Sequence, residues 1–236
     1  MSSAAILDGP ARVGGPAVLA AVAAIHASID ALAAVTSPTG LDPSDHARAV
    51  GELSRAQSRL AAQKLLLLAA ADTAKVAKAS GASGTDAWLA TRTHQDPAEA
   101  AREVRLGREL ADRCQATQEA LSDGRISPAH AQVITAATDR LPDRLTDHQR
   151  RRVEQSLVAR AQLTDPVTLR REARRSLAEV EEDPAVVDAH ENTELVQAEH
   201  AAHAKTRLGL HDNGDGTVTG SFTIPQLHGD MLAKIL

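Results

Sequence analysis

TDAWLATRTHQDPAEAAREVRLGREL, residues 85–110, is the stretch from which we derive the fold. It has the composition of a short helix and a longer helix, separated by a polar turn of about three or four residues that includes Thr93-His94-Gln95. Thr85 or Asp86 can cap the first helix, and Asp96 can cap the second. Two helices joined by so short a turn have the spacing of a helix-turn-helix, although most helical hairpins of this kind bind nothing. We predict a helix-turn-helix-like unit over residues 85–112.

The composition limits the kinds of protein that this chain can be. It has 236 residues, 43% of them apolar, which is enough for a substantial core. A net charge of −5 argues against a protein that coats nucleic acid with its whole surface, although a local basic face stays possible. One Trp, one Phe and no Tyr argue against stacking on single-stranded bases. The single cysteine allows no internal disulfide, and no zinc-type ligand spacing occurs, so we expect a cytoplasmic protein without metal or cofactor.

The N-terminal part predicts a flexible arm followed by a helix. Residues 1–15 are rich in Gly, Ala and Pro, and apolar residues then recur at positions 18, 22, 25, 29 and 32, in alternating steps of four and three. This stripe is suited to packing against another helix. Because His26, Ser28 and Asp30 interrupt the apolar run, we expect no membrane span.

Further along, start signals and breakers predict a long Ala-rich helix over residues 42–80 and several shorter helices. Asp212-Asn213-Gly214-Asp215-Gly216 favours positive φ and joins two alternating segments, which predicts a β-hairpin at 206–223. We therefore expect a mainly α protein: one helical domain over 16–236, a multi-helix bundle with long antiparallel helices, the helix-turn-helix-like unit and a small C-terminal hairpin. The other expected helices cover residues 128–138, 147–163, 166–182, 184–205 and a segment from Pro225 onward.

Several of these joints occur in an order typical of one family. The joints are Trp88-Leu89 with DPAEA at 96–100, LSDGRIS at 121–127, LTDPVTLR at 163–170, Asp183-Pro184 and the hairpin RLGL to GDGTVTG at 207–220. From about Leu41 onward the chain resembles the actinobacterial thirteen-E-twelve repeat family, also called domain of unknown function two hundred and twenty-two.

The resemblance implies an association with nuclease chemistry that this sequence does not itself contain. Proteins similar to this one usually carry a C-terminal HNH endonuclease module, which needs paired histidines and an Asn on a metal-binding ββα unit. We find no such segment, and we expect the chain to be the N-terminal region of such a protein. The resemblance therefore assigns no catalytic residue to this chain, because we find none of the residues that perform the HNH chemistry.

The predicted second helix of the helix-turn-helix carries the first candidate site. Arg102, Arg105 and Arg108 gather on its outer face, where they are able to reach phosphates or base edges of DNA. The alternative is that Arg105 with Glu109 and Arg108 with Asp112 form i,i+4 pairs that simply keep a solvated helix soluble.

A second candidate is a basic tract that runs from Arg140 to Arg175. Its arginines can contact phosphates, but an acid-rich segment, residues 179–199, follows at once. An equally good interpretation is that the basic tract and the acid-rich segment pair with each other, within one chain or between two. The candidate residues of this tract are Arg150, Arg151, Arg152, Arg170, Arg171, Arg174 and Arg175.

Three histidines near the C-terminus are a minor metal candidate. His200 and His203 at i,i+3, with His190 nearby, are able to share an ion, but their order matches no zinc motif and solvent-facing histidines explain them better. Our leading expectation is a non-catalytic domain that targets double-stranded DNA. The alternative is a structural module that assembles into a homodimer through its long helices, without binding nucleic acid.

Overall fold

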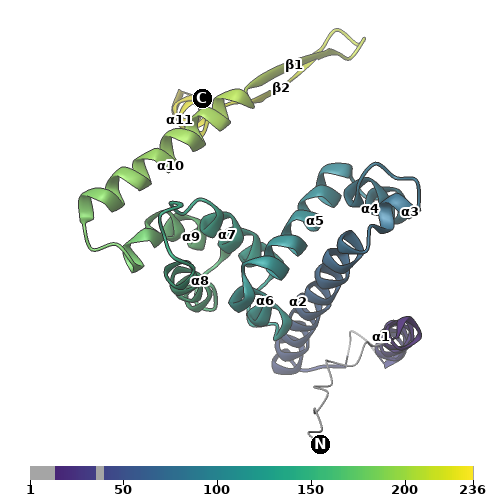
Figure 1. Cartoon of the computed structure of the whole chain (residues 1–236). Coiled ribbons are helices and arrows are strands. Elements are labelled where there is room, and N and C mark those ends of the chain that lie inside the picture. The colour runs from purple at the N-terminus through teal and green to yellow at the C-terminus, as the bar shows by residue number, and fades with distance from the viewer. Residues whose placement is uncertain (1–13, 36–39, 236) are drawn as a thin grey trace, which may run out of the picture. The chain divides into compact units, whose positions relative to one another are not determined.

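The computed structural model describes residues 14–35 and 40–235 (Figure 1). The chain divides into two compact units, residues 1–51 and 52–236, with the boundary inside helix α2. The predicted arm, residues 1–15, lies outside the described residues except for its last two positions. The candidate site lies wholly in the second unit.

Helix α1 (Gly15–Val35) begins within a residue of its predicted start, but none of its residues is buried. Most of its apolar stripe is exposed within the single chain, and packing of this stripe against another helix stays a prediction. Among the described helices, α1 alone is long and apolar enough to cross a membrane. A signal sequence or the core helix of a soluble protein has the same length and composition, so the absence of a membrane span stays a prediction.

Helix α2 (Pro43–Thr73) is shorter than predicted, because the expected single helix to residue 80 is interrupted. Lys75 adopts a left-handed conformation with φ of 55°, and the short helix α3 (Val76–Ala79) follows it. The hydroxyl of Thr73 donates to the carbonyl oxygen of Ala69 at 3.0 Å, a bond that competes with regular helix geometry at this end. Burial of Ala77 then fixes the new direction of the chain.

The predicted helix-turn-helix-like unit is present as helices α4 (Thr85–Thr93) and α5 (Pro97–Asp112). Asp96 caps α5 as predicted, accepting hydrogen bonds from the backbone N–H groups of Ala98 and Glu99 at 2.8 and 3.1 Å. The predicted cap of α4 is wrong, because the N-cap residue is Gly84 and no side chain caps the helix. The buried hydroxyl of Thr85 donates instead to Asp72 of α2, at 2.5 Å, because packing against α2 takes priority.

Helix α5 lies very close to α2 at Gly107 (Figure 1). A Cβ atom on Gly107 would be 2.7 Å from the carbonyl oxygen of Leu65, so only glycine permits this approach. Beyond α5, Cys114 is buried and precedes helix α6 (Gln115–Ser122). Gly124 follows α6 with φ of 70°, the left-handed conformation in which helices commonly end.

Helices α7 (Pro128–Asp139) and α8 (Asp147–Ala161) begin with reciprocal caps. Ser127 and His130 form the capping box of α7, and Thr146 and Gln149 form that of α8. These local signals place both helix starts within one residue of their predicted positions.

The predicted helix over 166–182 is in fact two pieces. Helix α9 (Pro166–Glu172) passes into a 3-10 helix, Ala173–Glu179, so the four arginines of this segment do not share one regular α-helical face. Leu169, Ala173 and Leu177 are buried, so the tighter winding still directs these side chains into the core. Helix α10 (Pro184–Ala204) then agrees with its prediction, and Val187 is its one buried residue.

The β-hairpin is confirmed as strands β1 (Arg207–Asp212) and β2 (Val218–Thr223). They pair antiparallel, with Leu208 opposite Phe222. Helix α11 (Gln226–Ile235) follows.

The main core contains side chains from α2, from each helix of the series α5 to α9, and from the 3-10 helix. Its most buried side chains include Leu110, Leu121, Ile134, Leu157 and Leu169. A second cluster under α4 contains Leu89 and Val104, with Trp88 packed against it. The expectation of a mainly α protein with a small C-terminal hairpin is confirmed.

Candidate nucleic-acid interface

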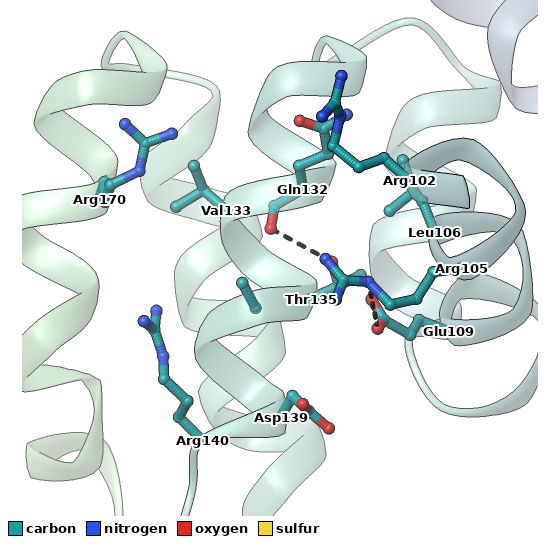
Figure 2. A pocket seen from close by; sticks show the side chains of 11 residues that line it. Arg102, Arg105, Leu106, Glu109, Gln132, Val133, Thr135, Asp139, Arg140 and Arg170 are labelled. Carbon is teal, nitrogen blue, oxygen red and sulfur yellow. Dashed lines mark hydrogen bonds and ion pairs between the residues drawn. The ribbon is translucent and has the colours of Figure 1, made fainter. Parts of the chain in front are cut away.

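Four arginines surround one surface hollow of about 400 Å³, which we call the arginine hollow. Arg102 and Arg105 come from α5 on one side of α7, whereas Arg140 and Arg170 lie on its other side (Figure 2). Helix α7 supplies the residues between the two pairs, and Arg140 directly follows its last residue. Because the arginines come from α5, from the end of α7 and from α9, the packing of these three helices brings them together.

Buried neighbours direct two arginines of the arginine hollow, Arg105 and Arg170, toward the solvent. Leu106, next to Arg105, is 4% exposed, and Leu169, next to Arg170, is fully buried. Alternate sides of these helices therefore face the core and the solvent. The outward direction of the arginines follows from the burial of their neighbours and needs no partner for the guanidinium groups themselves.

The charges of the arginine hollow are only partly balanced. Its lining contains two carboxylates: Glu109 lies 3.7 Å from Arg105, and Asp139 lies 3.3 Å from Arg113, a residue outside the lining. Within the described part of the chain, Arg102 and Arg170 have no carboxylate within 4.0 Å. A phosphate or another anion is therefore the ligand that this lining favours.

Small side chains lie between the two arginine pairs. Thr135, whose hydroxyl donates to the carbonyl oxygen of Gln132 at 3.3 Å, is buried, and Ala136 beside it adds only a methyl group. The exposed amide of Gln132 adds an uncharged side chain with both a donor and an acceptor to offer. These small side chains leave room for a phosphate or another anion between the two arginine pairs.

Arg108, predicted to share a DNA-contacting face with Arg102 and Arg105, lies outside the arginine hollow. Its guanidinium donates two hydrogen bonds to the carboxylate of Asp72, at 2.7 and 2.8 Å. This bidentate pair raises the pKa of Arg108 and, together with the hydroxyl of Thr85, lowers the pKa of Asp72. Arg108 therefore ties α5 to α2.

The three consecutive arginines of α8 also lie outside the arginine hollow. Arg150 donates to the carbonyl oxygen of Pro142 at 2.9 Å, and to those of Thr138 and Leu141 at 3.4 and 3.5 Å, so it holds the turn after α7. Arg151 and Arg152 are exposed on α8. Arg151 lines a separate hollow in which Asp147 and Glu154 supply negative charge.

The later arginines divide between the arginine hollow and the acid-rich segment. Only Arg170 lines the hollow; Arg171 is exposed and Arg174 is half-buried. Arg175 contacts Asp188 and Glu191 of α10, at 3.0 and 2.6 Å. Further pairs join Arg140 to Glu194, Arg144 to Glu181, and Arg160 to Glu179. Pairing of the basic tract with the acidic segment within one chain is therefore confirmed for these residues.

The histidines and the cysteine offer no comparable site. His203 contacts Glu199 at 3.8 Å and packs edge-on against His228, while His200 is exposed and His190 half-buried. Across residues 14–35 and 40–235, no group of three or more His, Cys, Asp or Glu side chains could hold a metal ion. Burial raises the pKa of the Cys114 thiol to about 11, so the thiolate needed for reactivity is scarce at neutral pH.

Arg140 belongs to the predicted basic tract but not to the residues expected to contact DNA, and Gln132 is not predicted to lie at the site at all. Arg140 was visible only as one member of a long basic tract, and Gln132 lies in a helix without any Lys or Arg. Since both join the site through the packing of α7 between α5 and α9, no local pattern singles them out.

Comparison with known families identifies the chain as a family member. Residues 47–221 match the family described as Domain of unknown function (DUF222), so the chain belongs to this family. The match confirms the resemblance found from the helix joints and the hairpin. No match was found among curated proteins or among solved structures.

Proposed function

We propose that this chain binds the phosphodiester backbone of double-stranded DNA in the arginine hollow, without catalysing a reaction. The observation that carries the proposal is the convergence of Arg102, Arg105, Arg140 and Arg170 on one hollow. Arginine is the residue best suited to phosphate recognition, because its planar donors bind two oxygens at once.

The shape of the arginine hollow favours contact with the DNA backbone over base reading. Long arginine side chains lie on both sides of it (Figure 2), and its lining also contains small side chains such as Ala136, so a row of phosphates enters more easily than a base edge. Because no aromatic residue lines it, stacking of unpaired bases is not supported. We expect binding with little dependence on DNA sequence, since phosphate contacts carry none.

In a longer protein, such a domain would serve as a targeting module. The resemblance to proteins with a C-terminal HNH endonuclease supports this role, in which the helical domain holds the duplex and another module cuts it. Binding of DNA by the helical domain is the part of this proposal that the present chain can test.

A second candidate function, homodimer formation, is supported by α1. Val22, Ile25 and Ile29 follow the spacing of a coiled-coil seam and are 39%, 39% and 53% exposed. Light scattering over a range of concentrations tests this candidate. A monodisperse monomer at every concentration would contradict it.

Paired substitutions of equal charge test DNA binding. Arg102→Gln with Arg170→Gln removes two cations of the arginine hollow, and Arg151→Gln with Arg152→Gln removes two exposed cations outside it. Each backbone contact contributes roughly 60-fold to affinity at about 10 mM salt relative to 1 M, so the first pair is expected to cost on the order of 1,000-fold or more. The second pair is expected to cost less than about tenfold.

Fluorescence anisotropy with a labelled 20-base-pair duplex measures both variants, with circular dichroism as the check of folding. Equal losses in the two variants would contradict the site. No binding of the unaltered chain at about 10 mM salt would contradict the function itself.

A further inference from the structure

Arg140 differs from the other cations of the arginine hollow, because a carboxylate of another element already holds it. Its Nε atom lies 2.8 Å from Oε2 of Glu194, on α10. The side chain of Glu194 is 10% exposed and that of Arg140 is 47% exposed. The arginine is thus open to solvent on one side while its partner is nearly covered.

Helix α10 is attached to the rest of its unit by few apolar contacts and by several ion pairs. Val187 is its one buried residue and Val186 packs against the main core, while Asp188, Glu191 and Glu194 pair with Arg175 and Arg140. Ion pairs between partly exposed side chains are individually weak and are screened by salt. A ligand with several phosphates therefore meets modest resistance at Arg175, whereas at Arg140 it has to displace the nearly covered carboxylate of Glu194.

We infer that Glu194 is an intramolecular competitor that occupies Arg140 in place of a DNA phosphate and thereby weakens DNA binding. The inference rests on the proposed function, because it concerns the regulation of the same arginine hollow. With Glu194 in place, three arginines are available without breaking a short ion pair; without it, four are. The carboxylate oxygens of glutamate offer Arg140 the same kind of acceptor as a phosphate oxygen, which is why the two compete for one guanidinium.

Removing the negative charge of Glu194 is expected to strengthen DNA binding. Glu194→Gln keeps the size of the side chain, and the affinity for the 20-base-pair duplex is expected to rise about fivefold at about 10 mM salt, the upper range for an ion pair of this exposure. Glu199→Gln is the matched control: it removes the same charge from the same helix, and Glu199 contacts only His203 in the described structure. The control is expected to change affinity by less than about twofold.

A double-mutant cycle separates the specific contact from a general change of charge. In an Arg140→Gln background, Glu194→Gln is expected to have no further effect on affinity, because the arginine for which it competes is gone. An equal gain with and without Arg140, or an equal gain from Glu199→Gln, would overturn the inference and leave DNA binding intact. No change with Glu194→Gln would do the same. Absence of DNA binding in every variant would overturn both the inference and the proposed function.

Discussion

Gly107→Ala tests the close contact between α5 and α2 on which the position of Arg102 and Arg105 depends. The added Cβ atom would lie 2.7 Å from the carbonyl oxygen of Leu65, against about 3.4 Å for ordinary contact. Since both atoms belong to packed helices, the helices must separate by several tenths of an ångström. Such overpacking costs about 1–3 kcal/mol, and the better helix propensity of alanine offsets roughly 1 kcal/mol of it. We expect a net loss of about 1 kcal/mol of unfolding free energy.

Gly51→Ala is the control, because Gly51 also lies within a helix, α2, and a Cβ atom there meets nothing within 4 Å. This variant is expected to gain roughly 0.5–1 kcal/mol, the intrinsic difference in helix propensity. Urea unfolding followed by circular dichroism measures both free energies. Equal stabilisation by the two substitutions would refute the close approach of α5 to α2.

Two further predictions concern buried and capping carboxylates. Glu154 is 2% exposed and accepts hydrogen bonds from the backbone N–H and the hydroxyl of Thr117, at 2.7 and 2.8 Å, while burial raises its pKa. Glu154→Ala is expected to lower the free energy of unfolding in urea by about 2 kcal/mol, because the N–H of Thr117 loses its acceptor. Glu154→Gln keeps an acceptor without the buried charge and should be no less stable than the unaltered chain at pH 7. Similar losses of unfolding free energy in both variants would contradict this account. Asp165 caps α9, and hydrogen bonds from the side chain and then the backbone of Thr168 lower its pKa from 3.8 to about 2. Because the pKa of Asp165 is lower in the folded chain, its stabilisation is present above pH 3.8 and is lost as the pH falls toward 2. The melting temperature of Asp165→Asn should therefore fall less over this pH window than that of the unaltered chain.

Helix starts and the hairpin were predictable because their signals are local. Asp96 caps its helix as predicted, and Ser127 and Thr146 cap helices directly before their predicted starts. The Asn-Gly and Asp-Gly pairs of the turn set the hairpin. Each signal depends on hydrogen bonds or φ preferences within a few residues. A single sequence is therefore sufficient to find them.

The helix interruptions and the composition of the arginine hollow depend instead on tertiary packing. The predicted long helices change direction at Lys75 and change winding at the junction of Glu172 and Ala173. Neither place has a Gly or Pro that would signal the change. Likewise, Arg108 looks equivalent to Arg102 on a helical wheel, and only the position of Asp72 on α2 separates a structural arginine from an available one. These distinctions come from contacts between elements distant in sequence.

The dependence of DNA affinity on salt tests the central claim most directly. Three arginines of the hollow, Arg102, Arg105 and Arg170, are available without displacing Glu194. The logarithm of the association constant plotted against the logarithm of salt concentration should therefore fall with a slope of about −3, and two duplexes of unrelated sequence should give the same slope and affinity. Undetectable binding at about 10 mM salt, or binding whose strength does not change with salt, would contradict the account.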